Sequence, residues 1–118
     1  MEAIKLFDSE LKIMEIIWRE GSLSAKQISM IAAKEIGWNK NTTYTVIKKL
    51  IGKNAVKREE PGFICSSLIA RDTVQKDETD RLIDKLWGGS KKTFFAAFVN
   101  EQLSDDEINE LKSLIEKK

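Results

Sequence analysis

The 118-residue chain contains no histidine, one cysteine and one proline, and these absences exclude several kinds of site. Without histidine, the chain lacks the commonest general base and the commonest transition-metal ligand. Cys65 has no second thiol with which to form an intramolecular disulfide or a zinc site, so we interpret it as a small strand residue. We therefore expect no catalytic residue, no metal site and no cofactor, and the chain is not expected to be an enzyme.

Long apolar runs are also missing from the chain. No stretch of about 18 apolar residues could span a bilayer, and the opening Met-Glu-Ala-Ile-Lys lacks the basic and then apolar order of a secretory signal. With 42% hydrophobic and 33% charged side chains, the composition fits one compact domain, or a small domain with an appendage. We expect a cytoplasmic protein that does not insert into a membrane.

Acidic side chains are absent from residues 36–58, a window of 23 residues, although the whole chain has 20 basic and 19 acidic residues. The window also contains the hydroxyl- and amide-rich segment 39–45, whose groups can bond phosphates and base edges. This segregation indicates a polyanion as partner, and we interpret the segment as the start of a DNA-reading helix. A solvated basic face is the alternative. The cations of the window are Lys40, Lys48, Lys49, Lys53, Lys57 and Arg58.

Two structural helices are predicted before this segment. The first has a good N-terminal cap in Asp8 and a stop signal in Gly21. The second is capped by Ser24 and ended by Gly37. The apolar positions with helical spacing are Leu11, Met14, Ile17 and Trp18 in the first helix, and Ile28, Ile31, Ala32 and Ile36 in the second.

The third helix is expected to begin at Asn39, whose side chain can bond the free amides of the first turn. At about 100° per residue, Thr43 falls on its apolar face, while Thr42 and Tyr44 fall on the flanks. That apolar face contains Val46, Ile47, Leu50 and Ile51. The residues that face the opposite way are Asn41, Thr45, Lys48 and Lys49.

A helix with Thr and Asn near its start and Lys toward its end suits the major groove of DNA. We expect base contacts from Asn41 and Thr45 and a phosphate contact from Thr42. Lys48 and Lys49 would bond phosphate or guanine. The full predicted DNA-binding set, which includes two later cations, is Lys40, Asn41, Thr42, Tyr44, Thr45, Lys48, Lys49, Lys57 and Arg58.

A β-hairpin is predicted after the third helix. Asn54 can adopt the left-handed conformation that closes a helix, and Pro61 and Gly62 supply a tight turn between the stretches 55–59 and 63–68. β-branched and aromatic residues flank that turn. Three helices followed by a hairpin is the order of a winged helix-turn-helix, so the expected fold is mainly α with a small β-hairpin.

The composition changes near Ala70. Residues 1–70 carry eleven basic and eight acidic residues, a net of +3, whereas residues 71–118 carry nine and eleven, a net of −2. We therefore expect a DNA-binding domain in 1–70 and a separate helical domain in 71–118. The second domain should contain three helices, one from residue 72 to 86 or 87, one that holds the phenylalanines, and one opened by the capping box at Ser104.

These three predicted helices have little chain around them, yet they carry many large apolar residues. A segment this short is marginal as a solitary core, so we predict that two copies pair as a homodimer that reads an inverted repeat. The alternative is that the helices fold back on the first domain. The expected dimer contacts are Leu82, Leu86, Phe94, Phe95, Phe98, Val99, Leu111 and Leu114.

Three segments together resemble a known family. They are 8–18, 38–50 with Thr42 and Thr45 in place, and 98–111 with Leu-Ser-x-Asp-Glu-Ile-x-Glu-Leu at its end. In this combination the chain resembles the penicillinase-repressor family, of BlaI and MecI type. The resemblance implies a homodimeric winged-helix repressor on a double-stranded DNA operator, controlling a gene of β-lactam-resistance type.

The resemblance also implies a mode of induction. A membrane sensor with a metalloprotease domain detects the antibiotic, and the repressor is then cut in its dimerisation region, which here corresponds to the bond between Ala97 and Phe98. That branch typically has Asn before the scissile Phe, where this chain has Ala97. Relatives commonly carry Lys and Arg where this chain has Asn41 and Tyr44, which implies a different operator sequence.

Two further interpretations follow from the sequence. The related copper-responsive branch carries paired cysteines near its C-terminus, and this chain has none there, so a copper sensor is disfavoured. A different class of function is a protein-interaction module, in which the winged helix and the C-terminal helices bind partner proteins without DNA.

Overall fold

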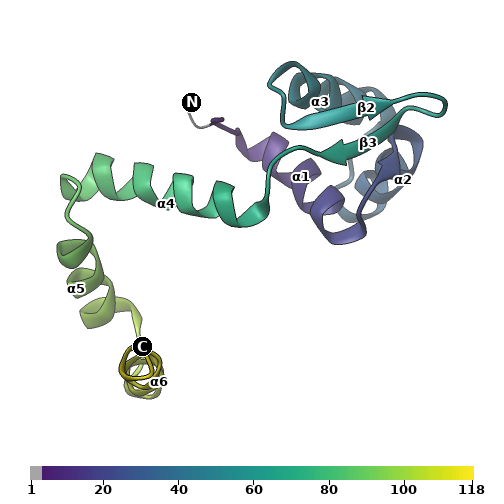
Figure 1. The fold of residues 1–118 in the computed structure, drawn as a ribbon. Helices are drawn as coiled ribbons and strands as arrows, with labels where there is room; N and C mark the ends of the chain where they lie inside the picture. The colour runs from purple at the N-terminus through teal and green to yellow at the C-terminus, as the bar shows by residue number, and fades with distance from the viewer. Residues whose placement is uncertain (1–3) are drawn as a thin grey trace. The chain divides into compact units, whose positions relative to one another are not determined.

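The computed structural model describes residues 4–118 (Figure 1). The chain forms two compact units, a first unit that ends at Asp77 and a second unit over Glu78–Lys118. The predicted fold, mainly helical with a small sheet, is confirmed. No helix of the described part has the length and apolar character needed to cross a membrane. The elements in chain order are α1 (Asp8–Glu20), β1 (Leu23–Ser24), α2 (Ala25–Glu35), α3 (Lys40–Gly52), β2 (Val56–Glu59), β3 (Ile64–Ser67), α4 (Arg71–Trp87), α5 (Lys91–Gln102) and α6 (Asp105–Glu116).

The N-terminal cap of α1 differs from the prediction. Phe7, not Asp8, occupies the cap position, and its backbone N–H donates to the Glu10 carboxylate at 2.8 Å. Glu10 thus reaches back to the chain before the helix, as the acidic partner of a capping box does, while phenylalanine has no acceptor to complete the box. Asp8 is the first helical residue, where its charge favours the positive end of the helix dipole.

The predicted caps of α2 and α3 are confirmed. The Ser24 hydroxyl accepts from the Gln27 backbone N–H at 3.0 Å, and the Gln27 side chain accepts from the Ser24 N–H at 2.9 Å. The Asn39 side chain accepts from the Thr42 N–H at 2.8 Å. At the other end of α3, Asn54 has a φ of 62°, as expected for a residue that closes a helix.

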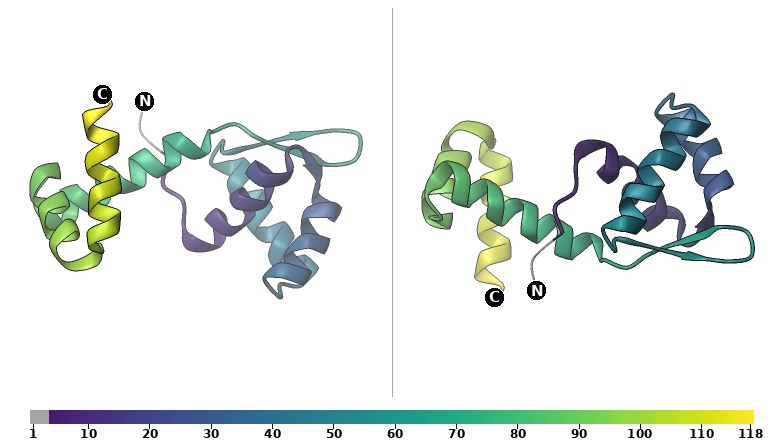
Figure 2. Two further views of the ribbon diagram at one scale, coloured as in Figure 1. Left: turned by 90° about the horizontal axis from the view of Figure 1, so that it is seen from below. Right: turned by 90° about the horizontal axis from the view of Figure 1, so that it is seen from above.

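The hairpin is part of a three-stranded antiparallel sheet with the order β1-β3-β2. Gly62 has the positive φ expected at the turn between β2 and β3, and the hairpin projects from the helices of the first unit (Figure 2). β1 was not predicted, because two residues show no strand pattern of their own. It exists through its pairing with β3, in which Leu23 lies opposite Cys65. Cys65 is fully buried in the central strand, which confirms it as a small strand residue.

The core of the first unit lies between α1, α2, α3 and the sheet. Burial of each large aliphatic side chain in this core contributes about 1.5 to 3 kcal/mol to the free energy of unfolding. Val74, in the first turn of α4, joins the same core, and the indole N–H of Trp18 donates to the Ile69 carbonyl at 2.9 Å. The start of α4 is thereby tied to α1. The fully buried side chains include Ile13, Met14, Ile17, Ile28, Ile47, Leu50 and Val56.

The second unit holds the later turns of α4 together with α5 and α6. The predicted capping box of α6 is confirmed, because the Ser104 hydroxyl accepts from the Glu107 N–H at 3.2 Å and the Glu107 carboxylate accepts from the Ser104 N–H at 3.0 Å. That backbone hydrogen bond lowers the pKa of Glu107. Phe94 contacts three rings, with centroid distances of 5.0 Å to Trp87, 5.4 Å to Phe95 and 5.9 Å to Phe98. No residue of α5 or α6 is buried.

Candidate nucleic-acid interface

The predicted direction of α3 is confirmed by burial. Thr43, Val46, Ile47 and Leu50 are buried against the core. Of the two residues predicted on the flanks, Thr42 is exposed and Tyr44 is half-buried. The polar residues that the sequence placed outward are all exposed, namely Asn41, Thr45, Lys48 and Lys49. One side of α3 therefore anchors the helix and the other presents amides, hydroxyls and cations together.

Hydrogen bonds along α3 decide what its threonines can offer. The Thr45 hydroxyl donates to the Asn41 carbonyl at 2.8 Å, and the buried Thr43 hydroxyl donates to the Asn39 carbonyl at 3.1 Å. Because its only hydroxyl proton is used within the helix, Thr45 presents oxygen lone pairs and a methyl group. An oxygen acceptor suits the amino groups of adenine or cytosine, and the methyl suits that of thymine.

The hairpin cations are paired with acids two residues later. Lys57 Nζ lies 3.5 Å from Glu59 Oε1, and Arg58 Nη2 lies 2.7 Å from Glu60 Oε1. The hydrogen bond from Arg58 lowers the pKa of Glu60. All four side chains are exposed, so each pair is screened by water and contributes little to stability.

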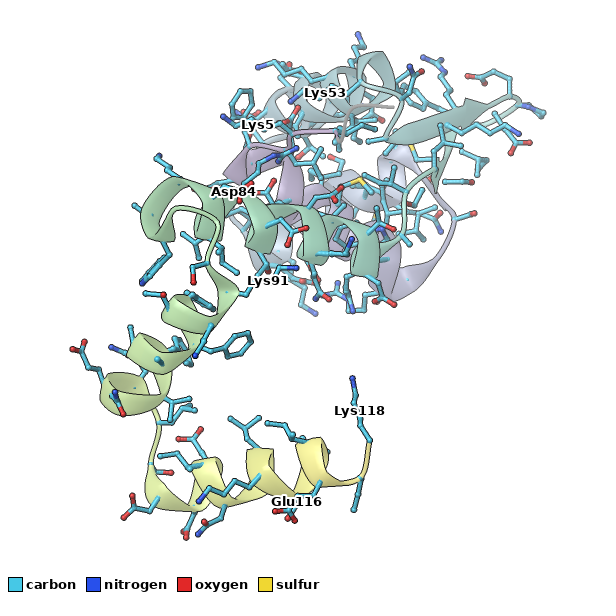
Figure 3. All side chains as sticks on the ribbon, turned by 60° about the vertical axis from the view of Figure 1, so that its left-hand side comes forward. Lys5, Lys53, Asp84, Lys91, Glu116 and Lys118 are labelled. Atoms are coloured by element: carbon cyan, nitrogen blue, oxygen red, sulfur yellow. The ribbon has the colours of Figure 1, made fainter. Side chains whose placement is uncertain are left out.

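Lys53 belongs to the acid-free window but not to its exposed face. Its Nζ donates to the Glu10 carboxylate at 2.6 Å and to the Lys5 carbonyl at 2.9 Å, and lies 4.3 Å from the centroid of the Phe7 ring. Lys53 and Lys5 are labelled in Figure 3. Glu10 is only 1% exposed. One of the cations that the sequence grouped as polyanion-facing therefore stabilises the fold. The pattern alone could not show this, because the two partners are 43 residues apart.

The residues predicted as dimer contacts are largely uncovered in the single chain. Phe94 and Val99 are half-buried. Ile115, which the prediction left out although it lies on the apolar stripe of α6, is 72% exposed. The bond between Ala97 and Phe98 lies inside α5. The exposed members of the predicted set are Leu82, Leu86, Phe95, Phe98, Leu111 and Leu114.

Metal-ligating residues do not gather in this structure. Within residues 4–118, no group of three or more histidine, cysteine, aspartate or glutamate side chains is placed to hold a metal ion. Burial raises the pKa of the Cys65 thiol to about 11, so this thiol is protonated at neutral pH.

The first unit has three helices followed by a hairpin, and α3 has one buried and one exposed face. These features define it as a winged helix-turn-helix domain. The penicillinase-repressor model matches residues 6–117, and the chain belongs to that family. The family resemblance seen in the sequence is confirmed.

Similar proteins cover nearly the whole chain. A penicillinase repressor of Bacillus licheniformis is 26% identical over 115 residues, which are 95% of this chain and 90% of the relative. A penicillinase repressor of Staphylococcus aureus is 30% identical over 115 residues, with 95% and 91% covered. The methicillin resistance regulatory protein MecI of Mammaliicoccus sciuri is 28% identical over 117 residues, with 97% and 95% covered.

Two solved structures share the fold of part of the chain. The DNA-binding domain of the repressor BlaI has a TM-score of 0.56 and 26% identity, and the match covers 62% of this chain and 93% of that one. The monomeric form of Bacillus licheniformis BlaI in complex with the blaP half-operator has a TM-score of 0.55, with the same identity and coverage.

Proposed function

We propose that the chain is a transcriptional repressor that binds an operator in double-stranded DNA through α3 and the β2–β3 hairpin. The observation that carries the proposal is the outward face of α3, which presents Asn41, Thr45, Lys48 and Lys49 with no carboxylate in the helix. The BlaI monomer, of similar fold, is known in complex with a half-operator, which supports the same role here.

The exposed residues divide by the part of DNA that each can reach. Asn41 can pair with adenine, and Thr45 can accept from a base amino group or touch a thymine methyl. Thr42 lies in the first turn of α3, where its exposed hydroxyl can donate to a phosphate at the positive end of the helix dipole. Lys48 and Lys49 form no ion pair in the described part of the chain, so their full charge is available to phosphate or guanine.

A second copy of the chain is proposed to pair with the first through the second unit. The large apolar side chains of α4, α5 and α6 named above are exposed, and α5 and α6 bury no residue of their own. Association of two copies would remove this surface from water, and it would present two reading helices to an inverted repeat whose half-sites are about one helical turn apart.

The salt dependence of binding tests the DNA-binding proposal. If each copy neutralises roughly four phosphates, the logarithm of the association constant should fall with the logarithm of salt concentration at a slope near −7. The measurement is fluorescence anisotropy with duplexes from the chain's own upstream region, at several salt concentrations. A slope near zero, or no binding at low salt, would reject the proposal.

Charge reversal on α3 supplies the matched comparison. The double variant Lys48→Glu, Lys49→Glu should abolish binding to the duplex. The double variant Lys117→Glu, Lys118→Glu makes the same change in net charge at the C-terminus and should retain binding. Equal loss in both variants would mean that net charge, and not the face of α3, governs the interaction.

Induction is proposed to proceed by cleavage between Ala97 and Phe98, by a membrane sensor protease that responds to β-lactams. The bond lies in a helix without buried residues, and such helices open locally at low free-energy cost. Cutting there would divide the apolar surface of the second unit and uncouple the two half-sites. Co-expression with an active sensor and antibiotic should produce a fragment that ends at Ala97. An intact chain under those conditions would exclude this route.

A further inference from the structure

Four side chains form a stack that runs from α3 to the β2–β3 hairpin. Lys40 Nζ lies 5.5 Å from the centroid of the Tyr44 ring, and the Tyr44 and Phe63 rings meet edge-on with centroids 5.9 Å apart. On the Phe63 ring, the guanidinium carbon of Arg58 lies 3.6 Å from the centroid. Tyr44 and Phe63 also pack against the hydrophobic core, so the stack rests on a fixed base.

Glu60 contacts the edge of the Arg58 guanidinium. One carboxylate oxygen accepts from Arg58 Nε at 2.8 Å and lies 2.7 Å from Nη2, while the other accepts from the Phe63 backbone N–H at 3.2 Å. The Phe63 carbonyl in turn accepts from the Ala25 N–H at 2.9 Å. Phe63 has a φ of 51°, which is uncommon for a side chain of its size, and these bonds hold it there.

The neighbouring ion pair lacks these features. Lys57 Nζ is 3.5 Å from Glu59 Oε1, and among residues 4–118 no aromatic ring forms a cation-π contact with Lys57. Lys57 is therefore held by one exposed ion pair, whereas the guanidinium of Arg58 has a ring on one face and a carboxylate at its edge. In the part of the chain that the structure describes, no hydrogen bond uses Nη1 of Arg58, so this group remains able to donate to a phosphate oxygen.

We propose that Glu60 and Phe63 are positioning residues, which hold Arg58 in a pre-formed pose for a DNA phosphate and, through Tyr44, fix that pose relative to α3. This inference rests on the proposed DNA-binding function. A long side chain that is already ordered loses less freedom on binding than a mobile one, so the clamp increases affinity although Glu60 itself is negative. Neither Glu60 nor Phe63 belongs to the DNA-contacting set that the sequence predicted.

The direction in which Glu60→Ala changes the affinity for DNA separates a positioning role from simple electrostatics. Removing a carboxylate beside a polyanion should tighten binding when only charge matters, and Glu59→Ala should do so or leave affinity within about twofold. Glu60→Ala removes the same charge from the next residue but also releases Arg58. We expect its dissociation constant to rise roughly threefold to tenfold, because an exposed stack and an exposed ion pair are lost together.

The experiment uses the full chain and a duplex that the wild-type protein enriches from a random-sequence pool. Affinities of the wild type, Glu59→Ala and Glu60→Ala are compared at one salt concentration, with far-UV circular dichroism melting curves to verify folding. Arg58→Lys keeps the charge without the planar group and should weaken binding by a similar factor. Glu60→Ala added to Arg58→Lys should then cause no further weakening.

A second pair of variants tests the ring without altering any charge. Phe63→Tyr keeps the stack and should bind like the wild type, whereas Phe63→Leu should weaken binding to the extent that Glu60→Ala does. Tighter or equal binding by Glu60→Ala, or equal binding by both Phe63 variants, overturns the positioning role and leaves the proposed function intact. Failure of the wild type to enrich any duplex instead overturns the proposed function.

Discussion

Replacement of Lys53 by methionine should destabilise the first unit without weakening the electrostatic part of DNA binding. Methionine keeps the apolar stem of the side chain but removes the cation from the Glu10 carboxylate. Glu10 has a second oxygen that is buried and, within the described residues, forms no hydrogen bond. In the variant, the Phe7 N–H at 2.8 Å would be the one hydrogen-bond donor left to the Glu10 carboxylate among residues 4–118.

The burial of Glu10 and Lys53 determines how far Lys53→Met lowers the free energy of unfolding. Removing one partner of a fully buried ion pair costs about 3 to 5 kcal/mol, because the other charge stays desolvated. The Lys53 side chain is 30% exposed, so water can enter where its ammonium group was and recover part of that loss. We therefore expect a decrease of about 2 to 3 kcal/mol in the free energy of unfolding. With a typical urea dependence, the midpoint would fall by roughly 1 M.

Urea unfolding followed by circular dichroism measures this decrease. The double variant Glu10→Gln, Lys53→Met removes both charges and should regain much of the lost stability, since a neutral amide can still accept from the Phe7 N–H. In DNA binding, Lys53→Met should keep the wild-type salt slope, whereas Lys48→Met, which removes one phosphate contact from each of the two copies, should reduce its magnitude by about 1.8. Wild-type stability in Lys53→Met, or a slope change equal to that of Lys48→Met, would refute the assignment of Lys53 to the fold.

Three further outcomes are expected. Thr45→Ala should cost about 1 to 3 kcal/mol on the enriched duplex and little on random duplex, and equal losses would contradict a base contact. Phe98→Asp should give monomers in sedimentation velocity with the first unit still folded. The matched variant Asn100→Asp, also on α5, should remain dimeric. An unchanged mass for Phe98→Asp would place Phe98 outside the interface. The Cys65 thiol, with a pKa raised to about 11, should react with iodoacetamide slowly in the native protein at pH 8 and fast in urea, because the thiolate forms appreciably only near pH 11; equal rates would contradict its burial.

Features that depend on neighbours three or four residues apart were predictable from the sequence. The caps at Ser24, Asn39 and Ser104 and the apolar stripe of α3 all follow from helical spacing, and each is confirmed. The Asp8 cap was wrong for a related reason. Two acids, at positions 8 and 10, could serve the start of α1, and Glu10 reaches back to the Phe7 amide from the third position of the helix.

Features that depend on distant partners were not predictable from the sequence. β1 forms only because β3 lies beside it, and its two residues carry no signal of their own. The pairing of Lys53 with Glu10 and the stack of Arg58 on Phe63 likewise join residues through the fold. Charge patterning located the candidate interface, while the division of its cations among binding, positioning and stability required the structure.

The different roles of these cations determine how the repressor would be released from DNA. Of the six cations between residues 36 and 58, Lys53 is engaged internally, and the two on the hairpin are paired with acids. The three others, Lys40, Lys48 and Lys49, lie on α3 and form no ion pair within the described residues. One copy therefore brings few free charges to DNA, and most of the occupancy should come from the coupling of two copies. A monomeric variant such as Phe98→Asp should show about half the wild-type salt slope, with the affinity of a single half-site. Loss of the contact between copies would then be sufficient for release, with no change in α3 itself.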